Sequence, residues 1–397
     1  MADVDEIRRR MPAIIAGEVA AINRTFQGRS LDAGTRAAWT VVAGRSYIAY
    51  GLRLGGAVLP QDVDKLLPKL SEAMSALRRR PTDVRLRRKP LALEIAHPFP
   101  APLDWQRART ALDADTMLTG RNYSGGEPCD DVLRFDDTPH VLIAGTTGSG
   151  KSTLLRMMIA TLALNTSPAN LRLYLVDLKN TDLKPFRSLP HAELFAGEEN
   201  EARQAIRMVH REVRRRKDAE DIDAPRIVLV IDELAEVGDK DTLDLLSSIL
   251  RIGRSFRVNV VAATQLPTKA TCGEKNNYTV RFVGAVTDPQ TAALAAGRGE
   301  SGAHLLPGKG AFLRVEGTTL ERLQAYHLDM PGTASMVQQA VQRWGKRAVS
   351  AGYRGGEQAV RGGATTGEQP VRDDRHTGEA LVTPPVMAQE WQFWGET

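Results

Sequence analysis

The sequence predicts an α/β fold with a mostly parallel sheet covered by helices on both faces. Three observations predict it. Short, continuous apolar runs typical of strands buried on both faces occur at 171–176, 227–231 and 258–263. Helical stretches separate these runs, which is the alternation that a parallel sheet requires. A glycine-rich loop stands between an apolar run and a helical segment within residues 141–159 and opens the region.

Two smaller parts are expected before this region. Residues 1–44 form an N-terminal helical segment, since apolar residues recur at helical spacing from Val4 to Phe26, with one or two helices broken near Pro12. Residues 45–118 form a small α+β subdomain. It is expected to contain a strand, a helix and two more strands, at 46–54, 66–77, 84–88 and 91–95.

The main α/β domain is expected over residues 119–345, with further strands at 279–286, 310–315 and 321–328. Residues 346–397 lack periodicity and are rich in Gly, Thr, Glu, Gln and Arg, which predicts a flexible tail. The tail contains Trp391-Gln392-Phe393-Trp394, which is either a docking peptide for a protein partner or part of a floppy terminus.

The composition is that of a globular protein with a mildly basic balance. The 397 residues carry a formal net charge of +5, which suits a polyanionic partner but does not demonstrate one. Cys129 and Cys272 lie far apart, which favours free thiols in a reducing cytoplasm. No apolar run reaches the length of a bilayer span, so we expect a cytoplasmic protein without a membrane segment.

Residues 145–152 read Gly-Thr-Thr-Gly-Ser-Gly-Lys-Ser, between an apolar strand and a helix. This is the pattern of a phosphate-binding loop, whose backbone N–H groups point at the β- and γ-phosphates of a nucleotide. Lys151 adds a mobile positive charge, and the Ser152 hydroxyl is placed to ligate Mg²⁺. The predicted nucleotide contacts are Gly145, Thr146, Thr147, Gly148, Ser149, Gly150, Lys151, Ser152 and Thr153.

Two acids end the apolar strand at 227–231. Asp232 is expected to hold Mg²⁺ through water beside Ser152, and Glu233 to orient and deprotonate the attacking water. No Asn-Lys-x-Asp motif for guanine occurs, so ATP is the expected nucleotide.

The strand at 258–263 ends in Ala-Thr-Gln. The amide of Gln265 is expected to touch the γ-phosphate or the attacking water, the alternative being an ordinary loop glutamine. Arg254 and Arg281 flank this strand, and either could reach the nucleotide of a neighbouring subunit as an arginine finger or form a surface ion pair. Arg281 is the expected finger, with Arg254 as the fallback.

Several separate motifs resemble those of the FtsK/SpoIIIE DNA translocases in order and spacing, over roughly residues 45 to 330. They are His140 to Ser152, Val176-Asp177-Leu178-Lys179, Leu189-Pro190-His191, Val230 to Ala235, Arg254 with Ala263 to Pro267, and Leu305 to Gly310. The resemblance implies a hexameric ring of RecA-like P-loop domains that hydrolyse ATP between subunits and pull double-stranded DNA through a pore.

This chain also departs from the family pattern. Leu266-Pro267 replace the usual Arg-Pro, and neither membrane segments nor a winged-helix domain are recognisable. We therefore expect a mover of plasmid, phage or viral DNA, for transfer or genome packaging. The alternatives are a coupling protein or helicase that acts on single strands, and a protein-secretion ATPase.

A motor must grip DNA of any sequence, so its contacts should be basic and directed at the backbone. The expected contacts are Lys269 and Lys275, in the loop after the strand at 258–263, and Lys309, between two glycines. The more basic run from Arg211 to Lys217 is interpreted as a solvated helix face.

Overall fold

The computed structural model describes fourteen stretches of the chain, which leave out the tail at 346–397 as well as Lys269, Lys275 and Cys272. The described residues are 4–26, 31–33, 47–54, 59–78, 82, 84–88, 91–96, 103–108, 110–122, 129–237, 239–265, 267–268, 277–299 and 301–345. Among them, no helix combines the length and the apolar character needed to cross a bilayer.

The N-terminal part contains a four-stranded antiparallel sheet with strand order β1-β2-β4-β3. The strands are β1 (Leu31–Ala33), β2 (Tyr47–Leu54), β3 (Val84–Arg88) and β4 (Leu91–Ala96). The helices are α1 (Val4–Phe26), α2 (Pro60–Asp64) and α3 (Leu67–Arg78), and α1 and α3 contribute Ile22, Phe26, Leu70 and Met74 to a shared core. The predicted strands and helix are confirmed, but Pro12 lies inside one continuous helix, so the predicted break is wrong.

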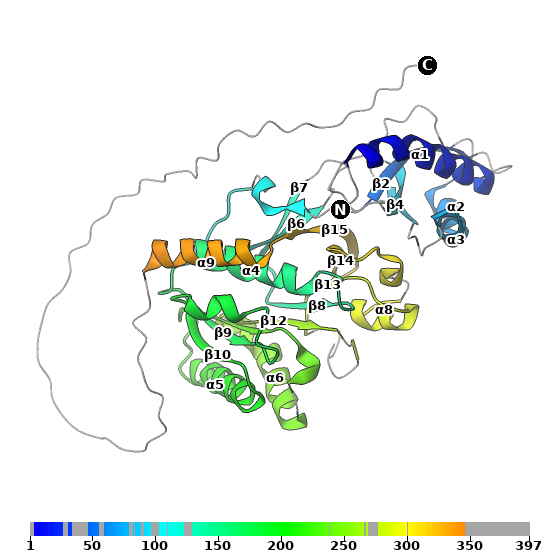
Figure 1. Ribbon diagram of the computed structural model, residues 1–397. Helices are drawn as coiled ribbons and strands as arrows, with labels where there is room; N and C mark the ends of the chain where they lie inside the picture. The colour runs from blue at the N-terminus through cyan, green and yellow to red at the C-terminus, as the bar shows by residue number, and fades with distance from the viewer. Residues whose placement is uncertain are drawn as a thin grey trace, which may run out of the picture. The chain divides into compact units, whose positions relative to one another are not determined.

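The main domain is built on an eleven-stranded mixed sheet (Figure 1). Ten strands follow the order β10-β9-β11-β12-β8-β13-β14-β15-β6-β7, and β5 pairs with β15. The six strands from β10 to β13 are parallel: β8 (His140–Ala144), β9 (Leu171–Val176), β10 (Ala192–Ala196), β11 (Arg226–Ile231), β12 (Val258–Thr264) and β13 (Val280–Val283).

The rest of the sheet is mostly antiparallel and was only partly predicted. Its strands are β5 (Leu103–Asp104), β6 (Thr116–Asn122), β7 (Cys129–Arg134), β14 (Ala311–Glu316) and β15 (Thr319–His327). The sequence analysis indicated β14 and β15 but not β6 and β7. Strands β5 and β6 begin before residue 119, where the main domain was expected to start.

Helices cover both faces of this sheet, as predicted. The helices α4 (Lys151–Asn165) and α9 (Met330–Trp344) share one core with the strands, and α5 (Glu199–Asp218) and α6 (Lys240–Ile252) share the other (Figure 1). Alternate residues of a strand therefore enter different cores: Val228 and Val230 face α4, whereas Leu229 faces α5 and α6. A third cluster joins α8 (Pro289–Ala296) to β13 and β14.

Candidate nucleotide site

The predicted site residues meet at the carboxyl edge of the parallel strands. The phosphate loop follows β8, Asp232 and Glu233 follow β11, and Gln265 follows β12, which lies between β8 and β11. Ligands of open α/β sheets bind outside the carboxyl ends of the strands. The strand order thus places the loop, the acids and the glutamine at one edge.

The loop leads into α4 through a left-handed residue. Gly150, the N-cap of α4, has φ 107°, and a Cβ there would lie 2.8 Å from the backbone nitrogen of Gly310. Both facts require glycine. Glycine at this position therefore lets the backbone of Gly310 approach the start of α4 closely, and the N–H groups of a helix N-terminus after such a loop form an arrangement that binds phosphates.

The turn at residues 308–310, from a distant part of the chain, contacts the phosphate loop. The backbone N–H groups of Lys309 and Gly310 donate to the carbonyls of Gly148 and Ser149, at 3.3 and 2.8 Å. The N–H of Thr146 donates to the carbonyl of Ala285 at 2.8 Å. Short-range sequence patterns carried no sign of these contacts.

Lys151 bends back over the loop, where its Nζ donates to the Thr146 carbonyl at 3.0 Å. Only 6% of Lys151 is exposed, and burial lowers the pKa of its ammonium, which Glu233 and Asp232 partly offset. Ser152 follows in the first turn of α4 and is partly exposed. Both residues thus lie where the sequence predicted.

Asp232 is buried and lies near two further acids. Its burial, together with the charges of Asp182 and Asp177, raises the pKa of its carboxyl to about 7. Asp177 is fully buried; its Oδ2 accepts the N–H groups of Thr181 and Leu183, whereas Oδ1 has no hydrogen-bond partner in the part of the chain that the structure describes. Asp182 forms an ion pair with Arg156 of α4. No sequence pattern assigned these two acids to the site, although Asp177 follows a predicted strand and lies in the motif Val176-Asp177-Leu178-Lys179.

Glu233 is held by the end of β12. Its carboxylate accepts the hydroxyl of Thr264 at 3.0 Å and the N–H of Gln265 at 3.1 and 3.0 Å. The Gln265 side chain in turn accepts the Thr147 hydroxyl at 2.8 Å, so it contacts the phosphate loop. Thr264, whose role no sequence pattern indicated, links Glu233 to β12, the strand that precedes Gln265.

The chemistry of the site fits Mg²⁺ brought in with a nucleotide. A divalent cation would offset the crowded charges of Asp232 and its neighbours, and Ser152 lies in the first turn of the adjoining helix. Across the described residues, no cluster of three or more His, Cys, Asp or Glu side chains could hold a metal by itself. Mg²⁺ usually takes one or two protein ligands and completes its shell with phosphates and water.

The two arginines lie in different environments. Arg281 in β13 is 3% exposed, and its guanidinium donates to the Ala295 carbonyl of the same chain at 3.2 Å. This placement counts against Arg281 as a residue that reaches a neighbouring subunit. Arg254 is exposed and lies just before β12, at the amino edge of the strands and away from the phosphate loop of its own chain.

Of the three lysines expected to grip DNA, the structure describes Lys309. Its side chain is exposed, and its backbone has φ 54°, in the left-handed region. Through the contact with Gly148 it lies beside the phosphate loop. Lys269 and Lys275 lie outside the described residues.

Comparison with known proteins shows what part of this chain resembles. The FtsK/SpoIIIE family model matches residues 126–264. DNA translocase FtsK of Staphylococcus epidermidis is 29% identical over an alignment of 257 residues, and the match covers 56% of this chain and 32% of that protein. The Staphylococcus aureus protein of the same name is 30% identical over 227 residues, 49% of this chain and 28% of the relative. The chain thus spans about a third of the length of these relatives.

Solved structures of P-loop ATPases have the same fold. The pCW3 conjugation coupling protein TcpA, solved with ATPγS, has a TM-score of 0.53 at 19% identity and covers 83% of this chain and 99% of its own. EssC of Geobacillus thermodenitrificans, ATPases 2 and 3, has a TM-score of 0.52 at 20% identity and covers 62% of this chain and 51% of its own. These similarities show an α/β RecA-like core.

Proposed function

Because its phosphate-loop region belongs to the FtsK/SpoIIIE family, we propose that this chain is an ATP-driven motor that moves double-stranded DNA. The observation that carries the proposal is the convergence of the phosphate loop, the acids after β11 and Gln265 after β12 at one sheet edge. These are the groups that one chain contributes to binding and hydrolysing ATP.

In the proposed reaction the loop N–H groups and Lys151 bind the β- and γ-phosphates. Ser152 and, through water, Asp232 hold Mg²⁺, which neutralises charge on the phosphates when bound. Glu233 accepts a proton from the attacking water. It must first turn from Thr264 and the Gln265 N–H, both of which now occupy its oxygens. The Gln265 side chain also accepts the Thr147 hydroxyl. A bound phosphate that draws Gln265 away would therefore loosen its contact with Thr147 and the contact of its N–H with Glu233.

We propose a ring in which Arg254 completes the site of a neighbouring subunit. The seven residues of β12 separate Arg254 from the phosphate-loop edge, a span of about 20 Å at about 3.3 Å per residue. An exposed arginine so far from its own site is positioned to serve another chain. A hexamer is the assembly that the family resemblance implies.

For the DNA contact we propose Lys269, Lys275 and Lys309. Lys309 belongs to the turn that supports the phosphate loop, so a load on its side chain would act directly on the nucleotide site. Such a link is what a DNA-stimulated ATPase needs.

The second candidate is transfer of plasmid DNA by a conjugation coupling protein that acts on single strands. The fold match to TcpA covers nearly the whole of that chain, whereas EssC is matched over about half.

The decisive experiment measures ATP hydrolysis without DNA, with duplex and with single strands, alongside displacement of a third strand from a triplex. Duplex-stimulated turnover with displacement supports the proposal. Stimulation by single strands alone would favour the second candidate. Turnover that no nucleic acid changes would refute both. Glu233→Gln serves as the hydrolysis-deficient control.

A further inference from the structure

Helix α5 presents a row of arginines on the face away from its core. Its buried side chains include Ala202, Ile206, Val209 and Val213, which pack beneath the sheet with α6. The side chains of the opposite face recur at spacings of three and four residues, so they share one side of the helix. They are Asn200, Arg203, Gln204, Arg207, Arg211 and Arg214.

Three of these arginines have no acidic partner among the described residues: Arg207, Arg211 and Arg214 are exposed, and no ion pair joins them to the rest of the described chain. Their neighbours differ. Arg203 pairs with Glu199 and Asp239, Arg215 pairs with Glu212 and Asp221, and Arg216 is 1% exposed and pairs with Glu212. The interpretation of 211–217 as one solvated face is therefore wrong for Arg216.

The row is electrostatically costly where it stands. Like charges four residues apart on a helix destabilise it, and Arg207 and Arg211 form such a pair. The helix dipole favours cations only in the last turn, whereas Arg207 and Arg211 lie in the middle of α5. Neither core packing nor the dipole accounts for these two arginines, but a bound polyanion would.

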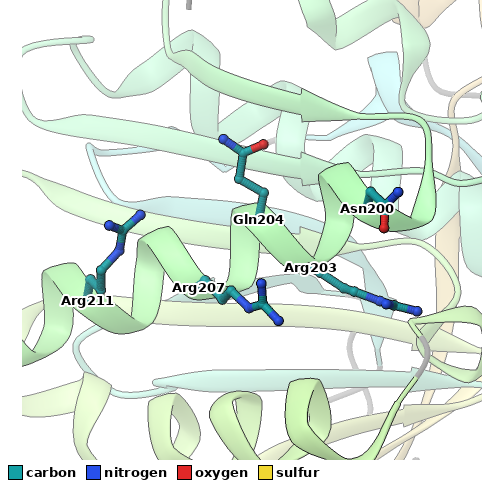
Figure 2. Close-up of a pocket in the computed structure, with 5 residues that line it drawn as sticks. All are labelled: Asn200, Arg203, Gln204, Arg207 and Arg211. Carbon is teal, nitrogen blue, oxygen red and sulfur yellow. The ribbon is translucent and has the colours of Figure 1, made fainter. Parts of the chain in front are cut away.

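The side chains also form a shallow hollow of about 420 Å³, lined by Asn200, Arg203, Gln204, Arg207 and Arg211. Figure 2 shows all five arising from α5, with Arg211 and Gln204 to one side of the helix axis and Arg203 and Arg207 to the other. The lining side chains offer guanidinium and amide N–H donors, and one of them, Arg203, already pairs with the carboxylates of Glu199 and Asp239. Such a lining suits an anion with many acceptor oxygens.

We propose that this α5 arginine row, Arg207, Arg211 and Arg214 with Asn200 and Gln204, binds the phosphate backbone of DNA. Arg207 and Arg211 are about 6 Å apart along the axis at about 1.5 Å per residue. Phosphates of one strand follow each other at about 3.4 Å of duplex axis and lie further apart along the strand itself. Flexible guanidinium groups thus reach successive phosphates, and the binding is independent of sequence.

This surface consists of residues outside the nucleotide site and the three proposed gripping lysines, so it is tested separately. The variant is Arg207→Gln with Arg211→Gln and Arg214→Gln, which keeps good helix formers on the surface. The matched control removes the same charge from exposed cations elsewhere, Lys184→Gln with Lys240→Gln and Arg251→Gln. Circular dichroism confirms that both variants are folded, and fluorescence anisotropy measures binding to a labelled mixed-sequence duplex over a salt series.

We expect the α5 variant to bind the duplex about tenfold or more weakly at about 0.1 M salt, with a salt slope reduced by about 0.9 for each lost contact. The control should stay near the wild type. An affinity and slope equal to those of the control would overturn the inference. So would loss of binding to a polyglutamate peptide with duplex binding intact, which would assign the row to an acidic protein partner.

The outcomes separate this inference from the proposed motor function. Weakened duplex binding by the α5 variant together with a wild type that no DNA stimulates would support the DNA surface and refute the motor. Unchanged duplex binding with normal DNA-stimulated turnover would do the reverse. A wild type that binds no duplex at all would refute both.

Discussion

The backbone N–H of Gln265 donates to both oxygens of the Glu233 carboxylate, with N–O distances of 3.1 and 3.0 Å. The acid that follows β11 is thereby fixed to the residue that follows β12. Since the Gln265 side chain also contacts Thr147 of the phosphate loop, one residue touches both the proposed base and the nucleotide-binding loop.

Lys151→Ala should abolish nucleotide binding or turnover, whereas Glu233→Gln should still bind ATP and stall before hydrolysis. The lysine supplies charge to the phosphates, and the glutamate takes a proton from water. Binding of a fluorescent ATP analogue and release of phosphate separate the two effects. Normal phosphate release by Glu233→Gln would show that another group is the base.

Thr264→Val should slow turnover about tenfold, equivalent to about 1.4 kcal/mol, because Glu233 loses a positioned donor while the side-chain shape is kept. The nucleotide KM should change little, since the Thr264 hydroxyl contacts the acid, whereas the loop is contacted by the Thr264 backbone carbonyl, which accepts the Gly145 N–H at 3.2 Å and is kept in the variant. Thr264→Ser restores the hydroxyl and should restore most of kcat. A serine variant as slow as the valine variant would point to packing instead of the hydrogen bond.

Mixing Arg254→Ala subunits with Glu233→Gln subunits should partly restore activity, because some interfaces then contain both intact groups. An arginine finger contributes about 10³ to 10⁵ in rate. The same mixture made with Arg281→Ala should not be rescued, since Arg281 is buried and bonded to the Ala295 carbonyl of its own chain. Rescue by the Arg281 variant alone would reverse the two assignments.

Gly150→Ala should lower the thermal stability more than Gly148→Ala does. Both glycines have a positive φ, 107° and 77°, so each substitution carries backbone strain of about 1 kcal/mol. Only at Gly150 would the new Cβ meet backbone, 2.8 Å from the Gly310 nitrogen, whereas nothing lies within 4 Å at Gly148. Calorimetry measures the melting temperatures of the two variants. Equal losses of stability would mean that the turn at 308–310 shifts to make room for the new Cβ at little energetic cost.

The protein should lose stability on acidification partly through His140, at the start of β8. Burial, assisted by the charge of Arg254, lowers the pKa of this histidine to about 4, and its Nδ1 accepts the Val260 N–H at 3.1 Å. The unfolded chain therefore binds the proton more tightly than the folded protein does. The contribution of neutral His140 to the free energy of unfolding is fully present above about pH 6.5 and is lost as the pH falls toward 4, and the loss is at most about 3 kcal/mol.

Denaturant unfolding at several pH values checks this contribution. His140→Asn keeps an acceptor for the Val260 N–H but cannot be protonated, so its stability should fall less between pH 6.5 and pH 4. A variant with the acid sensitivity of the wild type would assign the loss to other groups.

Much of the parallel half of the sheet could be predicted because its signals are local. Strand β9 matches its apolar run residue for residue, and β11 and β12 match to within one residue. The loop at 145–152 and the acids at 232 and 233 are contiguous patterns next to those strands. The carboxyl edge of a parallel sheet then brings them together whatever the details of the loops.

Strands β6 and β7 escaped prediction for the opposite reason. The sequence from Thr116 to Asn122 has no clear apolar alternation. Besides the nearby β7, its partner is β15, which lies about two hundred residues further along the chain. A pairing at that separation is decided by the packing of the whole sheet.

The sequence by itself determined the phosphate loop, the acidic pair and the strands that present them, because each is written in a few adjacent residues. Only the tertiary structure decided that Gly310 supports the loop, that Arg281 is buried while Arg254 is exposed, and that α5 leaves three of its arginines without an acidic partner among the described residues. These facts depend on contacts between distant segments, and a local pattern cannot show which distant residue will fill a given space or neutralise a given charge.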